Sequence, residues 1–592
     1  MNQHSDAAPL DEELRAGLVP YVCDQDKFFL PNTTLDSILQ YDKVYRILER
    51  FQFNKPDFVV AAAQYVFGAE NVRGREGHKP ARKIFAVLAL LGKVSSISGF
   101  MADRICDDDL PLLRHNEEGA NFDLVRTIDG KKRDISCFDG WEQRDIQQFD
   151  SYQWYMLSPS FIMEDGRAAF YKIDNRAIFP WLAYEDAVSQ SGFSVVRKEG
   201  DSFALKELTS ENRDEFELEV DALQKVKSNP HLVTLFTSYE YRQRYYLLFG
   251  WAEGGNLFDL WMQHNPCPKF DRTLVLWLGE QCLGLAEGLH RIHNTQLSFP
   301  HEPEHTLAVP DLKGGPDDKT CGRHGDIKPQ NILWFKHEPN KYDHGVLKIS
   351  DFGLARFHSH MTTKVSPVGI PVSQTYKAPE FELNEPISRP YDVWSLGCLY
   401  LEFITWLVLG WDGVYEFSSK RTQEQDCRVK FRQDTFFNLW RQEGGQEESN
   451  PGSATVKVAV REWINSLAPA DSRFLCDFLR YVENNMVILD KGKRHTTAKV
   501  RQELKEMYQR CLNDPAYCFS STSVYQTGRV EKAHQTMDRA PTAGVNVPMV
   551  HVHPVEEANS APTNGVATKR KLDTLSPEES GSDNPRKRNH CN

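Results

Sequence analysis

The chain has 592 residues, of which 40% are hydrophobic and 26% are charged, and its formal net charge is −13. That length exceeds what one hydrophobic core supports, so we expect two or more domains with the composition of a soluble globular protein. The negative charge argues against a body that binds nucleic acid directly. The 12 cysteines include no C-x-x-C pair, which favours a reducing compartment over a disulfide framework or a zinc site.

Neither a signal peptide nor a membrane span is predicted. The first 14 residues are acidic and lack an apolar run. Residues 84–92 are apolar but too short to cross a bilayer. Residues 393–411 approach spanning length but contain Glu402 and follow Asp392. A wholly buried helix of a large domain explains this run, so we expect no membrane partner.

Residues 1–180 are predicted to form a mainly helical accessory region. Thr33 and Asp36 have capping-box spacing, and apolar residues follow at helical spacing. A second helical face repeats at i, i+3, i+4 and i+7, comprising Ile84, Val87, Leu88 and Leu91. Residues 150–182 are rich in aromatic side chains and are expected to include strands leading into the next domain. The acidic run at residues 107–109 could ligate a metal, but we expect a solvated loop.

The most informative segment is residues 324–331, with the sequence His-Gly-Asp-Ile-Lys-Pro-Gln-Asn. It places a carboxylate, an ammonium and an amide on one loop, at Asp326, Lys328 and Asn331. Phosphoryl transfer from a nucleotide uses these groups to orient the attacking hydroxyl and accept its proton, to steady the phosphoryl group, and to hold Mg²⁺. The segments Asp351-Phe352-Gly353 and Ala378-Pro379-Glu380 follow in the order of the protein-kinase signature.

The chain therefore resembles the eukaryotic protein kinases, and Lys328-Pro329 resembles the serine/threonine type. The likeness covers roughly residues 185–512 and implies an α+β, two-lobed kinase domain at 181–512. Its small lobe would be rich in strands and its large lobe helical. The loop and the N-terminal extension also resemble kinase-like proteins of filamentous fungi. The implied function is ATP-dependent phosphorylation of serine or threonine hydroxyls on a protein substrate that the sequence does not identify.

The resemblance implies ATP and Mg²⁺ as cofactors and assigns residues to them. Asp326 would be the catalytic base, Lys328 would neutralise the γ-phosphate, and the hydroxyl of Ser373 would contact both. Asn331 and Asp351 would ligate Mg²⁺.

The loop expected over the phosphates departs from the family pattern G-x-G-x-x-G-x-V. The corresponding segment is Ser189-Gln190-Ser191-Gly192-Phe193-Ser194-Val195-Val196, with serine at all three glycine positions. Serine hydroxyls could donate to a phosphate, but each replacement stiffens the turn and adds bulk. The implied ATP-binding residues of this loop are Ser189, Ser191, Gly192, Phe193 and Val196.

Ala204 and Lys206 resemble the family's V-A-I-K strand, with Ala204 beside the adenine and Lys206 reaching the α- and β-phosphates. Glu219 is the implied partner of Lys206, Glu217 is its rival, and ordinary surface charges are the alternative. We favour the Lys206–Glu219 pair, because Lys206 closes an apolar strand where an unpaired charge would be unfavourable.

The segment that joins the two lobes would hold the adenine ring. By resemblance, Phe249 occupies the gatekeeper position. The backbone carbonyl of Gly250 and the backbone amide of Ala252 would bind adenine, and Leu333 would pack below it.

Gly325 stands where the family has an arginine that pairs with a phosphorylated activation segment. Phosphates on Thr362, Thr363 or Ser366 would therefore lack their usual arginine partner. We predict a non-RD kinase whose activity depends little on such phosphorylation. The missing arginine and the serine-rich loop leave an alternative open, a pseudokinase that binds nucleotide and acts as a scaffold.

Elsewhere, the resemblance implies a buried pair of Glu380 with Arg494 and an anchoring role for Asp392 under the catalytic loop. Residues 294–322 and 441–456 are expected to be surface loops. Residues 519–592 lose apolar periodicity and are predicted to be disordered.

The C-terminal tail carries two basic clusters, at residues 569–571 and 586–588. They resemble a two-part nuclear import signal, although basic clusters also occur in disordered tails without that role. A nuclear or cytoplasmic location is expected, with an import receptor as a candidate partner.

Overall fold

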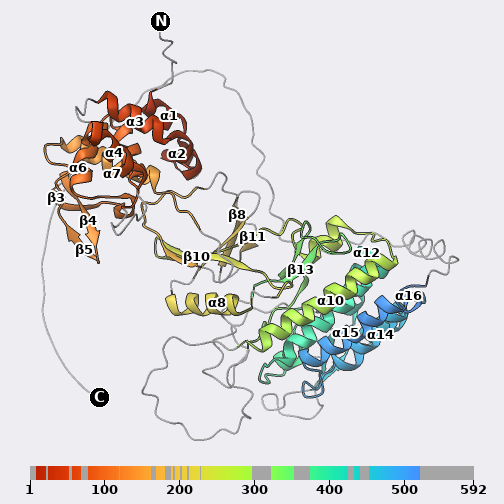
Figure 1. The fold of residues 1–592 in the computed structure, drawn as a ribbon. Helices are drawn as coiled ribbons and strands as arrows, with labels where there is room; N and C mark the ends of the chain where they lie inside the picture. The colour runs from red at the N-terminus through yellow and green to blue at the C-terminus, as the bar shows by residue number, and fades with distance from the viewer. Residues whose placement is uncertain are drawn as a thin grey trace, which may run out of the picture. The chain divides into compact units, whose positions relative to one another are not determined.

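The structure is a computed structural model (Figure 1). It describes residues 9–21, 24–51, 56–68, 78–118, 121–161, 169–180, 189–190, 194–199, 203–209, 212–226, 229–295, 322–351, 374–424, 432–440 and 453–520. All of these belong to one compact unit, Met1–Thr522. The mixture of helices and strands agrees with the predicted α+β class.

The first part of the chain packs helices around a hydrophobic core that includes nearly all of the predicted helix at residues 84–91. Its helices are α1 (Leu10–Ala16), α2 (Asn32–Ile38), α3 (Tyr41–Arg50), α4 (Pro56–Phe67), α5 (Arg82–Leu90), α6 (Ile97–Ala102) and α7 (Gln143–Gln153). Its strands are β1 (Val19–Tyr21), β2 (Asp24–Phe29), β3 (Leu113–Glu118), β4 (Asn121–Ile128) and β5 (Lys131–Arg133). Strands β3, β4 and β5 form one antiparallel sheet. Short 3-10 helices lie at Val94–Ser96, Asp107–Asp109 and Trp154–Met156.

The predicted capping box at Thr33 and Asp36 is wrong. Helix α2 begins at Asn32 after Pro31, so Thr33 lies inside the helix, and Asp36 pairs with Arg82 at 2.7 Å. The apolar residues that follow Asp36 at helical spacing are also divided between α2 and α3, because the chain leaves helical geometry at Leu39. The Leu39 side chain is 1% exposed and packs in the hydrophobic core of this region.

The expectation of a solvated loop at residues 107–109 is wrong for Asp107. Its carboxylate accepts hydrogen bonds from the backbone N–H groups of Lys83 and Ile84, in the first turn of α5. Burial raises the pKa of Asp107 to about 6, although those hydrogen bonds oppose the shift. Within the described ranges, no group of three or more His, Cys, Asp and Glu residues is placed to hold a metal ion. Asp107 therefore caps a helix.

A six-stranded sheet follows, in the order β6-β10-β11-β9-β8-β7. Its strands are β6 (Ala169–Lys172), β7 (Ser189–Gln190), β8 (Ser194–Glu199), β9 (Phe203–Leu208), β10 (Leu235–Tyr241) and β11 (Arg244–Gly250). Every pairing is antiparallel except that of β6 with β10. Helix α8 (Arg213–Val226) packs against β10 (Figure 1). Strand β6 lies within the aromatic stretch predicted to contain strands.

The rest is a helical body with two small hairpins. Its helices are α9 (Leu257–Asp259), α10 (Arg272–His293), α11 (Pro379–Glu382), α12 (Pro390–Gln423), α13 (Val458–Leu467), α14 (Arg473–Asn485), α15 (Thr497–Asn513) and α16 (Pro515–Cys518). A π-helical turn covers Leu260–His264, and a 3-10 turn covers Pro329–Asn331. The hairpins pair β12 (Ile332–Phe335) with β13 (Val346–Ile349) and β14 (Phe437–Trp440) with β15 (Ser453–Val456).

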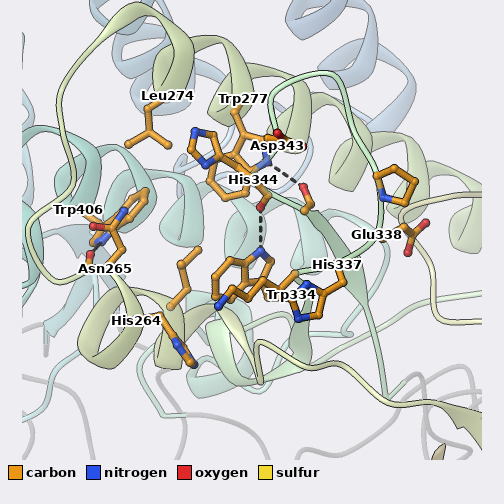
Figure 2. A pocket seen from close by; sticks show the side chains of 14 residues that line it. His264, Asn265, Leu274, Trp277, Trp334, His337, Glu338, Asp343, His344 and Trp406 are labelled. Atoms are coloured by element: carbon orange, nitrogen blue, oxygen red, sulfur yellow. Dashed lines mark hydrogen bonds between the residues drawn. The ribbon is translucent and has the colours of Figure 1, made fainter. Parts of the chain in front are cut away.

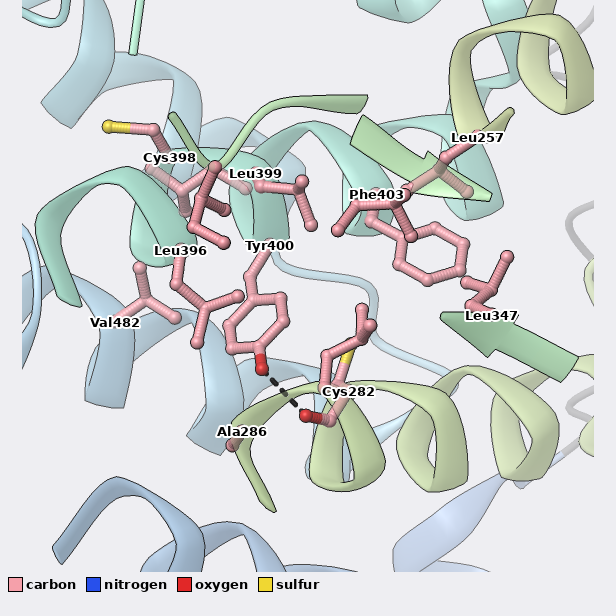
Figure 3. Close-up of a cluster of buried hydrophobic side chains, with 14 of the residues drawn as sticks. Leu257, Cys282, Ala286, Leu347, Leu396, Cys398, Leu399, Tyr400, Phe403 and Val482 are labelled. Carbon is pink, nitrogen blue, oxygen red and sulfur yellow. Dashed lines mark hydrogen bonds between the residues drawn. The ribbon is translucent and has the colours of Figure 1, made fainter. Parts of the chain in front are cut away.

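Helix α12 is the centre of this body. It is long and apolar enough to cross a membrane, but 89% of its most apolar window is buried inside the fold, as in a core helix. Figure 3 shows Tyr400 of α12 reaching α10, where its hydroxyl donates to the carbonyl of Cys282 at 2.6 Å. The helix kinks at Gly410, where φ is +73°. A Cβ there would lie 2.6 Å from the carbonyl oxygen of Pro266, so only glycine fits.

The two predicted surface loops have different outcomes. The prediction for 441–456 is wrong at its end, because Ser453–Val456 pairs with Phe437–Trp440 as β15. Exposed Ser453 and Thr455 alternate with half-buried Ala454 and Val456, as in a strand with one face in solvent. Most of the other insertion, residues 296–321, lies outside the described residues, as does nearly all of the predicted tail.

Candidate active site

Lys206 lies at the meeting point of three elements. It belongs to β9, whose register places Lys206 opposite Leu247 and Ala204 opposite Phe249. Its Nζ is 2.9 Å from Glu219 Oε1 on α8 and 3.0 Å from Asp351 Oδ1 after β13. The predicted pair with Glu219 therefore forms. Burial alone would lower the pKa of Lys206, but the charges of Glu219 and Asp351 and their hydrogen bonds raise it, so the amine is held as a cation.

The rival partner, Glu217, lies on a more exposed side of α8. Its carboxylate accepts from Arg213 at 2.7 Å within the same helix. Glu219 is 4% exposed, and its place beside the apolar stripe directs it towards β9. The helical periodicity that favoured Glu219 thus identified the buried partner.

The predicted catalytic loop, residues 324–331, brings its three predicted functional groups into contact. Asp326 Oδ2 lies 2.8 Å from Lys328 Nζ. The amide nitrogen of Asn331 donates to the Asp326 carbonyl at 2.8 Å and to Asp326 Oδ2 at 3.0 Å. Because Asn331 uses its nitrogen on Asp326, its oxygen is the atom suited to a cation. The loop thus orients one carboxylate beside one ammonium group.

Asp392 anchors this loop from below, as expected. It is fully buried at the start of α12 and accepts from the backbone N–H of His324 at 2.8 Å and of Gly325 at 2.6 Å. His293 Nε2 lies 2.8 Å from the same carboxylate. Burial would raise the pKa of Asp392, but the hydrogen bond with His293 and nearby positive charge lower it. An ionised carboxylate therefore holds the loop backbone.

The segment after β11 is fastened to the β12 hairpin. The amide of Gly254 donates to the carbonyl of Trp334 at 3.1 Å, and the amide of Trp334 donates to the carbonyl of Gly255 at 2.8 Å. A bridge joins Asn256 to Leu333, which brings Leu333 beside this segment. A Cβ at Gly254 would lie 2.2 Å from the Trp334 ring. The predicted adenine-binding residues Phe249, Gly250, Ala252 and Leu333 thus belong to connected elements.

Buried ion pairs hold the elements below the site. Arg494 makes two hydrogen bonds of 2.7 Å to the two carboxylate oxygens of Glu380, as the resemblance implied. A second buried group was not predicted from the sequence: Arg421 of α12 pairs with Glu402 and Asp434, each at 2.7 Å. Glu402 also accepts from the hydroxyl of Tyr376. One feature of the sequence could have indicated this group: Glu402 lies in an apolar run, and a carboxylate buried there needs a buried partner.

Several predicted residues lie outside the described part of the chain. They are Ser191, Gly192, Phe193, Phe352, Gly353, Ser373, Thr362, Thr363 and Ser366. Ser189 belongs to β7 and pairs with Val196 of β8.

Two cavities not anticipated from the sequence flank the β12–β13 turn. The first, of about 540 Å³, is walled by Trp277, Trp334 and Trp406, with His264, His337 and His344 around it (Figure 2). Trp334 Nε1 donates to the carbonyl of His344, and Trp277 Nε1 to that of Gly345, both at 2.9 Å. The second, of about 490 Å³, follows Phe249, Gly250 and Trp251. The turn residues His337 and Glu338 line both cavities.

Comparison with known proteins identifies a family whose model matches part of this chain. The model of the protein kinase domain matches residues 320–513, which contain Asp326, Lys328, Asn331, Asp351 and Glu380. Residues 320–513 therefore match a protein kinase domain, which supports the resemblance to the eukaryotic protein kinases. The match begins just before the catalytic loop, so the kinase family model does not extend to Lys206, Glu219 or the serine-rich loop.

Curated relatives are protein kinases of modest identity. A probable myosin light chain kinase of Dictyostelium discoideum is 25% identical over 280 residues, which are 43% of this chain and 50% of the relative. Serine/threonine-protein kinase 17A of Oryctolagus cuniculus is 29% identical over 223 residues, 36% of this chain and 47% of the relative. Serine/threonine-protein kinase RAD53 of Saccharomyces cerevisiae is 27% identical over 240 residues, 37% of this chain and 25% of the relative. The chain thus spans half or less of these relatives.

Proposed function

We propose that this chain transfers the γ-phosphoryl group of ATP to serine or threonine hydroxyls of a protein substrate. The observation that carries the proposal is the position of Lys206 Nζ, between Glu219 and Asp351 and within about 3 Å of each. A cation so placed can bind the α- and β-phosphates of a nucleotide. The proposal includes the two-lobed arrangement, with the six-stranded sheet and α8 as the small lobe and the helical body as the large one.

The loop residues take the remaining roles. Asp326 would orient the substrate hydroxyl and accept its proton, and Lys328 beside it would offset charge on the γ-phosphoryl group. Asn331 and Asp351 supply a neutral amide and a carboxylate, the oxygen ligands that Mg²⁺ prefers. Bound Mg²⁺ would neutralise the phosphate charge.

The serine/threonine preference rests on Lys328-Pro329 and on the serine/threonine kinases among the relatives. Ser373 would add a hydroxyl contact to Asp326 and Lys328. The phosphate-binding role of residues 189–196 also belongs to the proposal.

A second candidate is a pseudokinase that binds nucleotide and acts as a scaffold. The three serines at the family's glycine positions and Gly325 in place of arginine favour it. The joint presence of Lys206, Asp326, Asn331 and Asp351 favours the enzyme, since each group is needed for turnover.

The test uses the purified chain with Mg-ATP and a generic protein substrate. Asp326→Asn is the matched control, because it keeps the side-chain shape and removes the base. Phosphate transferred to serine or threonine by the wild type, and lost in the control, supports the enzyme. Thermal stabilisation by nucleotide without any transfer would instead support the scaffold, and transfer to tyrosine would overturn the proposed specificity.

The tail carries a separate proposal of nuclear import. Lys569-Arg570-Lys571 and Arg586-Lys587-Arg588 would bind an import receptor through their clustered charge. Alanine substitution of both clusters should move a fluorescent fusion from the nucleus to the cytoplasm. An unchanged distribution would refute this role.

A further inference from the structure

Strand β6 presents an aromatic side chain towards helix α8. The strand lies parallel to β10, with Phe170 opposite Ser238. Two hydrogen bonds fix its ends: Thr237 Oγ1 donates to the Ala169 carbonyl at 2.9 Å, and the amide of Ile173 donates to the Glu240 carbonyl at 3.0 Å. Since successive side chains of a strand point to opposite faces, Phe170 and Tyr171 serve different sides of the sheet.

The two rings contact different partners. The Phe170 ring is 5.5 Å from that of Phe216 on α8. The Tyr171 ring is 5.5 Å from that of Phe161 and belongs to the aromatic cluster on the other face. Phe170 is therefore the side chain by which β6 reaches α8.

Phe216 lies between two aromatic rings. Besides Phe170, it stacks on Tyr245 of β11 with ring centres 4.4 Å apart and planes 13° apart. Phe216 is 3% exposed. Among the described side chains of α8 before Glu219, Phe216 is the buried one. It therefore sets the position of the N-terminal half of the helix.

Glu219 follows Phe216 by three residues, so both lie on neighbouring positions of one helical face. A rotation or tilt that moves Phe216 also moves the Glu219 carboxylate. The other end of α8 is held separately, because Arg291 of α10 donates to the carbonyl of Lys225 at 2.9 Å. The end that carries Glu219 is thus the end that Phe216 and its neighbours control.

We infer that Phe170 is a positioning residue, which holds α8 in the orientation where Glu219 reaches Lys206. The inference rests on the proposed function, because the pair matters for phosphoryl transfer. Strand β6 precedes the predicted kinase domain at 181–512, so a segment outside that domain would supply the contact. The position of α8 would then be fixed by another part of the chain and not by a phosphorylated activation segment. The arginine that usually binds that phosphate is replaced by Gly325.

The test replaces Phe170 in the full chain and follows α8 in two ways. Phe170→Ala should lower kcat about tenfold, the size typical of coupling between sites. It should also accelerate hydrogen exchange of backbone amides within residues 213–226. Phe170→Leu, which keeps an apolar contact, should recover part of both. Lys172→Ala is the matched control, since Lys172 shares the strand and face, its side chain is 76% exposed, and both readouts should be unchanged.

Combination with Glu219→Gln distinguishes positioning from a general loss of stability. If Phe170 acts through Glu219, adding Phe170→Ala to Glu219→Gln should lower kcat by less than twofold more, because the pair is already weakened. A full additional tenfold loss would overturn the inference, as would unchanged exchange in α8 with Phe170→Ala.

Hydrogen exchange also separates this inference from the proposed function. A wild-type chain without phosphotransfer would count against the enzyme, whereas exchange of the α8 amides would still decide the role of Phe170. If Phe170→Ala loosened β6 and α8 equally, the contact would be merely structural and the inference would fail.

Discussion

Gly325 lacks the side chain of the family's arginine, and its backbone also adopts a conformation that favours glycine. Its φ is +80°, a region that is unfavourable for L-residues with a Cβ, while its amide donates to Asp392 at 2.6 Å. Glycine therefore allows the loop to meet its anchor without strain. An arginine at this position would have to adopt the same left-handed backbone.

We predict that Gly325→Ala lowers the free energy of unfolding by about 1–2 kcal/mol, the cost of the left-handed conformation, and also lowers kcat. Denaturant unfolding and steady-state rates measure the two effects. Gly140 has a similar φ of +78°, and a Cβ added there would meet open space, so Gly140→Ala should lose similar stability but keep its rate. Equal rates in both variants would contradict a special role for the loop geometry.

Activity should also depend little on phosphorylation of Thr362, Thr363 or Ser366, because Gly325 offers no guanidinium to a phosphate. Phosphatase treatment and glutamate substitutions at these positions should each change the rate less than about tenfold, which corresponds to about 1.4 kcal/mol. Mass spectrometry before and after treatment would verify the phosphorylation state. A larger change would show that another cationic side chain binds the phosphate.

At the scale of elements, the Glu380–Arg494 pair joins α11 to the turn before α15. The Arg494 side chain is 0% exposed and that of Glu380 2%. Arg494 also donates to the carbonyl oxygens of Ile488, Leu489 and Pro390. One side chain thus satisfies a carboxylate and three backbone groups.

Removing the charge of either partner should lower the free energy of unfolding by about 3–5 kcal/mol, since the remaining charge is left unpaired in the interior. Glu380→Gln and Arg494→Met test this by denaturant unfolding. The double variant should be less destabilised than the sum of the two single variants, because no unpaired charge remains. Strict additivity would indicate that the two residues act independently.

Local chemistry made part of this architecture predictable from the sequence. Asp326, Lys328 and Asn331 must share a loop because they are close in the chain, and helical periodicity favoured Glu219 over Glu217. The contacts of Arg421 with Glu402 and Asp434 could not be foreseen, since no local pattern selects a distant partner for a buried carboxylate. The pairing of strand β6 could not be predicted either, because its four residues pair with β10, which lies 68 residues later in the chain.

At the scale of the whole chain, one face of the sheet in the proposed small lobe is covered by residues that come before residue 181. Tyr239, Leu205 and Leu248 are 1%, 4% and 3% exposed, and they pack in one cluster with Phe179. Tyr21, Phe161 and Tyr171 pack against that cluster. The predicted boundary at residue 181 falls after these covering residues and after β6. A domain cut there would lose one strand and one wall of its core.

We therefore predict that a chain beginning at residue 181 is less stable and less soluble than the 592-residue chain. Exposing each large apolar side chain of the cluster would cost about 1.5–3 kcal/mol, and loss of β6 would leave β10 as an open edge that can pair with other molecules. A chain beginning at residue 157 keeps Phe161, β6 and Phe179, so it should recover much of the difference. Thermal unfolding and the soluble fraction after expression measure the order of the three. Equal values for the chains beginning at 157 and 181 would mean that residues 157–180 only lie against the sheet, and that its stability comes from the strands after residue 188.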